Sequence, residues 1–507
     1  MRKLPPVSFH AGYREYLFGS ASFSRGHIAY NDQVPILDTI AAISTPPGRG
    51  GIGIVRLSGP DALSIAQRLA NLRAPMEHAR ARLVDIPDPS QVSDDPEAKP
   101  ETRIDEALIT WFAAPNSYTS EDVIEVAAHG SPVVLDLLLR RALSLGARLA
   151  EPGEFTQRAF LSGRLDLTQA EAVRDLIDAQ TLSQARLAAS QMGGALSARV
   201  APTKAALIEL IALLEAGIDF AEDDLAVAPA AEIARRIDEI RPPLQALAST
   251  FAHGRILHDG LTLAIVGRPN AGKSSVFNAL VERERAIVTD MPGTTRDTVT
   301  ERIALGGIPL ELVDTAGLRE AADEAERLGI ARSREALADA AIVLIVIDAT
   351  EIAGKSDGGI QLHEEDRRLI DAVSGRSALI ALNKCDLVAE SLNRVDLVAA
   401  SAKTLPVLAT SAVTNSGIPK LRDAILKLAT GGAAAEPGML TSLRHYQAIT
   451  EALQGLDDAG TAVSADIPHE MVLLDLYRAL ADLDSLTGKT TPDDILNHIF
   501  ASFCIGK

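Results

Sequence analysis

Apolar positions along the 507-residue chain follow different periods in different blocks. Between residues 38 and 145, short apolar runs alternate with polar turns and helical stretches, which predicts a compact α+β unit. Strands are expected at 38–44, 53–57, 107–112 and 123–128. Helices are expected at 61–71, with Asp61 as the N-cap, and at 131–145. We interpret Thr45–Gly51 as a turn and Pro87–Pro100 as a polar loop.

Longer apolar stripes with a helical period lie on both sides of a block of strand-like runs. They occupy residues 167–199, 203–216, 230–251, 440–456, 471–486 and 493–500. Gly254–Gly260 and Gly431–Gly438 are interpreted as linkers at the edges of the central block. Since the two ends of a domain usually lie close together, the simplest arrangement is one helical domain, split in sequence, with the central block inserted at its surface. Two separate helical bundles are the alternative.

These patterns predict a multidomain α/β plus α protein. The expected boundaries are a flexible extension at 1–35, an N-terminal α+β domain at 36–155, helical parts at 156–257 and 431–507, and an inserted α/β domain at 258–430.

A phosphate-binding loop stands between an apolar strand and a helix. Residues Gly267–Ser274 read G-R-P-N-A-G-K-S and follow the run Leu261–Val266. Glycines let backbone N–H groups point at phosphate oxygens, while Lys273 adds a point charge and Ser274 a hydroxyl for Mg²⁺. The nucleotide-binding residues predicted here are Asn270, Ala271, Gly272, Lys273, Ser274 and Ser275.

Two later segments point to guanine as the base. The run 377–382 leads into Asn383-Lys384-Cys385-Asp386, in which the Asp386 carboxylate can accept from guanine N1–H and the 2-amino group. Adenine offers neither donor, so the wrong base would leave a buried polar group unpaired. A helix-capping cluster is the alternative interpretation of these polar residues. Ser411 and Ala412 are expected to close over the base.

Two further segments predict a switch that senses the γ-phosphate. Asp314 ends a strand and should reach the Mg²⁺ shell, and it is followed by Thr315, Ala316 and Gly317. A threonine in the preceding loop can ligate Mg²⁺ only while the γ-phosphate is present. That loop contains Thr289, Asp290, Met291, Pro292, Gly293, Thr294 and Thr295. The order of these parts resembles the Ras-like P-loop G domain over residues 258–430.

The position after Asp-Thr-Ala-Gly departs from many such GTPases. Leu318 stands where a glutamine often orients the attacking water, and leucine cannot form a hydrogen bond. A monovalent cation held by Asn270 and loop carbonyls would supply the missing charge. Asn270 as a simple cap of the loop is the alternative.

Charge and cysteine content narrow the surroundings of the protein. The net charge of −19 argues against a broadly basic RNA-binding surface. The sequence contains only two cysteines, which excludes a disulfide framework. It contains no apolar run of about 18 residues, so no membrane span is predicted. We expect a cytoplasmic protein without a membrane partner. Residues 1–35 are either a dispensable extension or a transit peptide, in which case a mitochondrial form is expected.

Four strings and the chain end carry a more specific resemblance. The strings are Thr45–Gly51, Pro115–Thr119, Pro152–Phe155 and Leu165–Ala172, and the end reads Phe503-Cys504-Ile505-Gly506-Lys507. With the inserted G domain, they resemble the tRNA-modification GTPase MnmE (TrmE) family from about Asp38 to Lys507.

The resemblance implies a K⁺-dependent GTPase that forms a homodimer through an N-terminal folate-binding domain. With the flavoprotein partner MnmG, an FAD protein joined in a heterotetramer, it would act on certain tRNAs. The reaction would add an aminomethyl or carboxymethylaminomethyl group to C5 of the wobble uridine. The one-carbon unit would come from 5,10-methylene- or 5-formyl-tetrahydrofolate. A ribosome-assembly GTPase without folate chemistry is the alternative.

The resemblance also assigns roles to residues. Folate would contact Arg56, Glu125, Arg164 and Lys507; K⁺ would be held by Asn270, Thr289, Met291 and Thr294; and Mg²⁺ would be held by Ser274 and Thr295. The catalytic set would be Glu326, Lys273, Thr295 and Cys504. Solvated surface charge is the alternative for Arg56, Arg164 and Lys507. The alternatives for Glu326 and Cys504 are an exposed helix carboxylate and a small buried hydrophobe.

Overall fold

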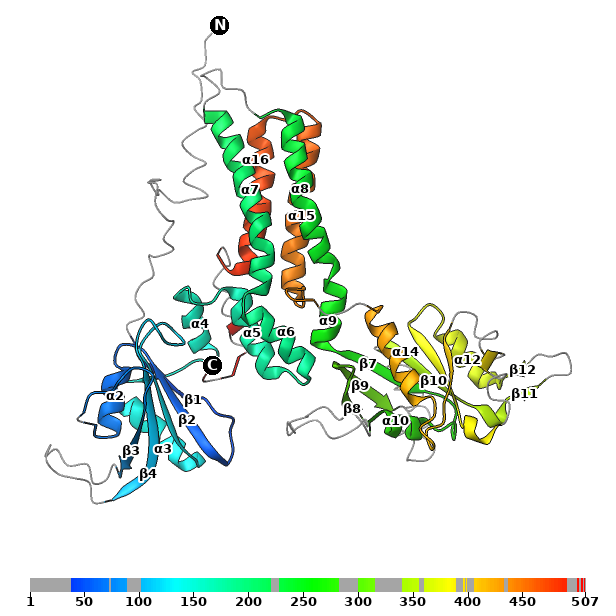
Figure 1. Ribbon diagram of the computed structural model, residues 1–507, viewed down its shortest axis with the longest axis horizontal. Coiled ribbons are helices and arrows are strands. Elements are labelled where there is room, and N and C mark those ends of the chain that lie inside the picture. Colours follow the sequence, from blue (N-terminus) through cyan, green and yellow to red (C-terminus); the bar gives the residue numbers. More distant parts are fainter. Residues whose placement is uncertain are drawn as a thin grey trace, which may run out of the picture.

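The computed structural model describes most of the chain from residue 38 onward (Figure 1). The described residues are 38–72, 74–88, 102–219, 228–281, 300–314, 340–354, 360–388, 395–396, 398, 405–432, 436–489, 499–500, 503–504 and 506. Figure 1 shows an N-terminal sheet domain, an elongated helical bundle and a second sheet domain attached at the base of the bundle. None of the helices within these ranges is long and apolar enough to cross a membrane.

The N-terminal domain is a six-stranded sheet with the order β3-β4-β5-β2-β1-β6. Its strands are β1 (Ile40–Ile43), β2 (Gly50–Ser58), β3 (Ala81–Pro87), β4 (Arg103–Phe112), β5 (Val123–Gly130) and β6 (Arg148–Leu149). Helices α2 (Ala62–Leu69) and α3 (Pro132–Ser144) share one apolar core with the sheet. The expected α+β unit is therefore confirmed.

One local expectation in this domain is confirmed in position only, and another is wrong. Asp61 occupies the N-cap of α2, but its side chain makes no capping hydrogen bond. Gly50 and Gly51, expected in a turn, begin β2, where Gly50 pairs with Gly130. A Cβ at Gly130 would lie 2.6 Å from the Gly50 carbonyl oxygen, so this close pairing requires glycine. The sequence analysis also missed β3 and β6.

A buried arginine ties helix α4 (Glu154–Leu161) to the sheet domain. The Arg158 side chain is 2% exposed and forms ion pairs with Asp38, Glu121 and Glu154. Burying one guanidinium is costly unless carboxylates and carbonyls satisfy its donors. The network therefore fixes α4 against the sheet.

The helical bundle draws one core from two distant parts of the sequence. Its helices are α5 (Leu167–Asp178), α6 (Leu182–Met192), α7 (Ala195–Asp219), α8 (Ala230–Ser249), α9 (Phe251–Asp259), α15 (Leu443–Ser464) and α16 (His469–Thr487). Apolar side chains of α7 and α8 share a single core with those of α15 and α16. The split helical domain is confirmed. The segment expected at 493–500 lies almost entirely outside the described residues.

Two expected boundaries in this domain are wrong. The single run at 167–199 is divided into three helices, because Thr181 begins α6 with a capping box and Gly193-Gly194 ends it. The expected linker at 254–260 is mostly helix α9. Gly254 lies inside that helix, where a Cβ would stand 2.1 Å from the Leu440 carbonyl oxygen. The glycine permits close packing of backbone rather than flexibility.

The inserted domain is a six-stranded sheet with the order β14-β13-β10-β7-β9-β8, parallel except for β8. Its strands are β7 (Leu261–Val266), β8 (Thr300–Leu305), β9 (Ile308–Asp314), β10 (Ile342–Asp348), β13 (Ala378–Asn383) and β14 (Val407–Ala409). The helical elements described here are α10 (Lys273–Val281), η3 (Ala349–Glu351), α12 (Glu364–Ala372), η4 (Cys385–Leu387) and α14 (Ile418–Thr430). A two-stranded piece, β11 (Ala353–Gly354) and β12 (Ile360–Gln361), lies apart from the main sheet.

Helix α6 contacts the inserted domain and both of the segments that connect this domain to the bundle. Thr181 Oγ1 donates to the Gly307 carbonyl in the β8–β9 turn over 2.7 Å. Gln184 Nε2 donates to the His258 carbonyl over 2.6 Å, just before β7. Gln191 Nε2 donates to the Met439 carbonyl over 3.2 Å, where the chain returns to the bundle. One helix therefore contacts both the entry and the exit of the domain.

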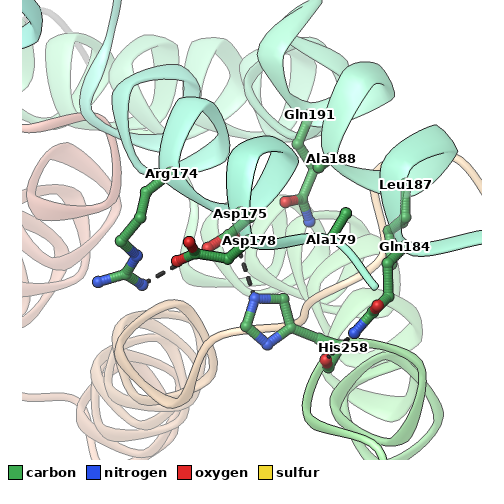
Figure 2. A pocket seen from close by; sticks show the side chains of 9 residues that line it. All are labelled: Arg174, Asp175, Asp178, Ala179, Gln184, Leu187, Ala188, Gln191 and His258. Carbon is green, nitrogen blue, oxygen red and sulfur yellow. Dashed lines mark hydrogen bonds and ion pairs between the residues drawn. The ribbon is translucent and has the colours of Figure 1, made fainter. Parts of the chain in front are cut away.

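A pocket of about 270 Å³ lies at this junction, between α5, α6 and α9. Figure 2 shows His258 and Asp175 pointing toward one another across it. His258 Nε2 lies 3.2 Å from an Asp175 carboxylate oxygen, and Nδ1 lies 2.8 Å from Asp259. The hydrogen bond that His258 donates to the Asp175 carboxylate raises the pKa of His258 to about 9, against the opposing effect of burial. At neutral pH the junction therefore contains an imidazolium–carboxylate pair.

Candidate functional site

The phosphate-loop motif forms the turn between β7 and α10. Gly267 has φ 153°, and a Cβ there would lie 2.3 Å from the Val346 carbonyl oxygen of β10. Asn270 and Gly272 have left-handed φ values of 62° and 92°. These conformations curl the loop at the carboxyl edge of a parallel sheet, where α/β proteins commonly bind ligands.

Lys273 begins helix α10 and points back into the loop. Its side chain is largely buried, and Nζ donates to the Arg268 carbonyl over 2.8 Å. Ser274 and Ser275 follow on the first turn and are exposed. Lys273 thus provides a cation within the loop, and both serine hydroxyls remain accessible beside the N-terminus of α10.

An asparagine links this loop to the segment expected to recognise the base. Asn383, 2% exposed at the end of β13, donates from Nδ2 to the Ala271 carbonyl over 3.1 Å. Its Oδ1 accepts from the Ala412 N–H over 3.2 Å. A single buried amide therefore joins three sequence-distant loops at one edge of the sheet.

Lys384 and Asp386 face different surroundings. Lys384 has a left-handed φ of 62°, and its ammonium lies 2.6 Å from Asp348 at the end of β10. Burial raises the pKa of Asp348, but hydrogen bonds from Lys384 and Thr350 outweigh it and keep the pKa below its ordinary value. Asp386 is exposed in η4, while Ser411 is buried and its hydroxyl accepts from the Thr414 N–H. The carboxylate of Asp386 is therefore accessible to a ligand.

Part of the predicted switch and cation set is outside the described residues. This applies to Thr289–Thr295, Thr315–Gly317, Glu326 and Lys507, and Asp314 is described only as the last residue of β9. The described cation candidates are Asn270 and Ser274, both exposed. Their side-chain oxygens are the ligand type that hard cations prefer.

A second group of predicted residues meets on the N-terminal sheet. Arg56 on β2 and Glu125 on β5 are direct cross-strand partners and form an ion pair of 2.7 Å. Arg56 Nη1 also donates to the Gly506 carbonyl over 3.4 Å, and Ser44 Oγ donates to the same oxygen over 3.1 Å. The penultimate residue of the chain therefore lies against a strand 450 positions earlier.

Aromatic rings complete this group, and the sequence analysis did not single them out. The Arg56 guanidinium lies 5.7 Å from the ring centres of both Tyr118 and Phe155, and the Arg164 guanidinium lies 5.7 Å from the Tyr118 ring. Burial raises the pKa of Tyr118, whose hydroxyl pairs with Thr156. The strings that contain Tyr118 and Phe155 gave the only sequence signal for them. We refer to Arg56, Glu125, Tyr118, Phe155 and Arg164 as the N-terminal cluster.

The C-terminal segment reaches this cluster over a small apolar patch. Phe500 and Phe503 pack with Leu167 and Phe160. The Cys504 carbonyl accepts from the Gly153 N–H over 3.5 Å, and the Cys504 side chain is exposed. The interpretation of Cys504 as a small buried hydrophobe is therefore wrong. Cys504 precedes by two positions the residue Gly506, whose carbonyl Arg56 contacts.

The fold and the loop at the sheet edge define a P-loop GTPase whose G domain is inserted into a helical domain. Residues 167–504 match the MnmE helical domain, and residues 39–164 match the N-terminus of the GTP-binding protein TrmE. The chain is 54% identical to the tRNA modification GTPase MnmE of Koribacter versatilis over 93% of this chain and 99% of that protein. It is 39% identical to the MnmE of Alkaliphilus oremlandii with the same coverage.

A solved G domain of the FeoB iron transporter of T. maritima is 26% identical and covers 33% of this chain and 98% of its own, with a TM-score of 0.25. The extent of the matches to the MnmE proteins decides the assignment. The chain belongs to the MnmE family of tRNA modification GTPases, and its enzyme class is that of a GTP hydrolase. Because both terminal domains match, the ribosome-assembly alternative loses its basis.

Proposed function

We propose that this protein couples GTP hydrolysis to a folate-dependent modification of the wobble uridine of certain tRNAs, in the cytoplasm and with a flavoprotein partner of the MnmG type. The partner's FAD would carry the redox chemistry. The observation that carries the proposal is the contact of the Gly506 carbonyl with Arg56, beside Glu125. This contact places the exposed Cys504 and the chain end at the N-terminal cluster, far in sequence from the G domain.

GTP would bind at the carboxyl edge of the inserted sheet. The phosphates would meet the N–H groups of residues 270–275 and the Lys273 ammonium, which must leave the Arg268 carbonyl to reach them. The exposed Asp386 would accept from guanine N1–H and the 2-amino group. The buried bridge through Asn383 keeps the phosphate and base segments in a fixed relation, which supports recognition of both ends of one nucleotide.

Two cations would assist hydrolysis. Mg²⁺ would be held by Ser274 with Thr295, and K⁺ by Asn270 with the loop groups of Thr289, Met291 and Thr294. A bound K⁺ would supply positive charge beside the transferred phosphoryl group, and Glu326 would help to place the attacking water. Support comes from the exposed amide of Asn270, which has a left-handed φ within the phosphate loop. Equal GTPase rates in K⁺ and in Na⁺ would remove the potassium part of the proposal.

A reduced folate would bind at the N-terminal cluster. Glu125 offers carboxylate oxygens for the donor edge of a pterin, and Arg56 and Arg164 offer cations for the anionic tail, with Lys507 as a third cation by the family resemblance. The faces of Tyr118 and Phe155 add flat apolar surface of the kind that a fused ring packs against. These donors, acceptors and rings fit a pterin ligand.

A homodimer would form through the uncovered face of the N-terminal sheet. Leu83 on β3 and Leu108 on β4 are direct cross-strand partners, and their side chains are 61% and 45% exposed. Exposed leucines side by side on a sheet face are typical of a surface that another chain covers. A second copy of this face is the expected occupant. The molecular mass of the native protein in solution, compared with the mass of one subunit, tests it.

Titration of the full chain with 5-formyl-tetrahydrofolate tests the folate assignment. Replacing Arg56 by glutamine removes one cation and leaves Glu125 unpaired, so the affinity should fall about tenfold. Arg103→Gln is the matched control. Arg103 on β4 forms an ion pair with Asp85 on the neighbouring strand β3 of the same sheet, but its side chain is 60% exposed. It should bind folate like the parent. Absence of binding by the parent protein, or an equal loss in both variants, would refute the assignment.

A further inference from the structure

The side chain of Arg268, the second residue of the phosphate loop, lies among three carboxylates. It forms an ion pair with Glu351 in η3. Its Nε lies 3.7 Å from Glu365, and its Nη1 lies 3.7 Å from Asp366, both in the first turn of α12. One guanidinium thus joins the loop after β7 to two elements that follow β10.

Burial makes this contact more than a surface ion pair. The Arg268 side chain is 20% exposed and that of Asp366 only 5%. A carboxylate in such surroundings is costly unless a cation stays beside it, because water no longer solvates it fully. Burial raises the pKa of Asp366, and Arg268 is the main cation that opposes this effect. The Arg268 guanidinium is therefore surrounded by carboxylates from both η3 and α12.

The backbone of the same residue organises the loop. The Arg268 carbonyl accepts from the Lys273 ammonium over 2.8 Å and from the Ala271 N–H over 3.3 Å. Immediately before it, the close approach of Gly267 to Val346 fixes the start of the loop against β10. The position of one carbonyl therefore sets the curl of the loop and the resting place of the lysine.

We propose that Arg268 is a positioning residue for nucleotide binding, which anchors the phosphate loop to η3 and α12 so that its N–H groups are preorganised for the phosphates. Preorganisation lowers the entropy that the loop loses when the nucleotide binds. The inference rests on the proposed nucleotide site. Since the anchor acts before and after hydrolysis, it affects GDP and GTP alike.

The experiment uses the full-length protein and measures dissociation constants for GDP and GTP and the rate of one turnover of bound GTP. Arg268→Gln should weaken both nucleotides about tenfold and change the single-turnover rate by less than about twofold. Arg268→Lys should lie between Gln and the parent, because one ammonium cannot replace a fork that meets carboxylates from two elements. Arg368→Gln, in an exposed pair with Glu364 on the same helix α12, is the control and should bind normally.

Further arms separate anchoring from other effects. If Arg268→Gln binds both nucleotides like the parent, or loses only the chemical step, the proposal is wrong. Recovery of affinity in the double variant Arg268→Gln with Asp366→Asn would also overturn it, because the loss would then come from an unpaired buried acid. If Arg268→Gln does not fold, Glu351→Gln takes its place, and the affinity for both nucleotides should fall about threefold. An unchanged affinity in Glu351→Gln would then show that the proposal is wrong.

Lys273→Ala distinguishes failure of the inference from failure of the site itself. If Lys273→Ala binds nucleotide normally, the proposed nucleotide site is wrong. If it loses binding while Arg268→Gln does not, only the anchor is wrong.

Discussion

The nucleotide site and the N-terminal cluster are assembled in opposite ways. In the G domain, each loop follows directly from its own strand, and the parallel sheet brings the strand ends to one edge. The N-terminal cluster instead combines a strand pair, a loop and helix α4, and Gly506 near the chain end contacts its Arg56. The first site depends on local motifs in a common sheet, and the second depends on the complete fold.

The sharpest test of the local site is Gly272→Ala. The residue has φ 92°, and a Cβ would lie 2.3 Å from Asn383 Nδ2, so alanine strains the loop and displaces the amide that bridges to the base segment. GTP affinity should fall by about 100-fold or more, while folate affinity remains unchanged. Isothermal titration with both ligands measures this.

Gly375→Ala is the matched control, since Gly375 also has a left-handed φ, 84°, but a Cβ would meet nothing within 4 Å. A similar loss of GTP affinity in both variants would mean that backbone strain alone, and not the bridge through Asn383, explains the effect.

The assembled site should respond to a change at the far end of the chain. Gly506 has φ 95°, and a Cβ would lie 2.7 Å from the Ile43 carbonyl oxygen, so Gly506→Ala displaces the carbonyl that Arg56 contacts. We expect folate affinity to fall about fivefold to tenfold, with GTPase activity within about twofold of the parent.

The control for this change is Gly146→Ala in the same domain, where φ is 117° and a Cβ would meet no neighbour. Unchanged folate affinity in Gly506→Ala would show that the docked chain end does not contribute to the site, and the contrast between the two regions would then weaken.

The last prediction concerns the stability of the junction between the helical bundle and the G domain. Because the pKa of His258 is raised to about 9, its stabilising contribution is fully present below about pH 6.5 and is lost as the pH rises through 9. After allowance for partial exposure, this is about 1–2 kcal/mol. The free energy of unfolding should therefore decline less between pH 7 and 10 in His258→Gln than in the parent.

His129→Gln provides the comparison, because His129 pairs with Asp105 but its side chain is 74% exposed. Identical pH profiles for the parent and His258→Gln would show that the junction pair does not stabilise the fold.

The sequence predicted the strand ends of the G domain well, because its motifs follow directly after apolar runs that form the parallel strands. Asn383 ends β13 as expected, whereas Lys273 already begins α10 and Asp386 lies in the short helix η4. The bridge from Asn383 to Ala271 was not foreseen, since it depends on how two loops meet. The residues of both switch segments remain predictions.

Elsewhere, residue type alone did not predict the local structure or the contacts. Gly254 indicated a linker, yet it lies inside α9 because the Leu440 backbone passes too close for any side chain. Arg56 and Glu125 lie on different strands. Their ion pair could be predicted only from the register between β2 and β5, which the sequence does not reveal. Tyr118 and Phe155 carried no chemical motif of their own, and only the fold gathers them around Arg56.

The attachment of the G domain has a mechanical consequence. Helix α6, only 11 residues long, contacts the segments through which the chain enters and leaves that domain, and a turn within it. Rearrangement of the G domain would therefore displace α6 together with α9, and α5, which packs against α6, would transmit the displacement to Phe500 and Phe503.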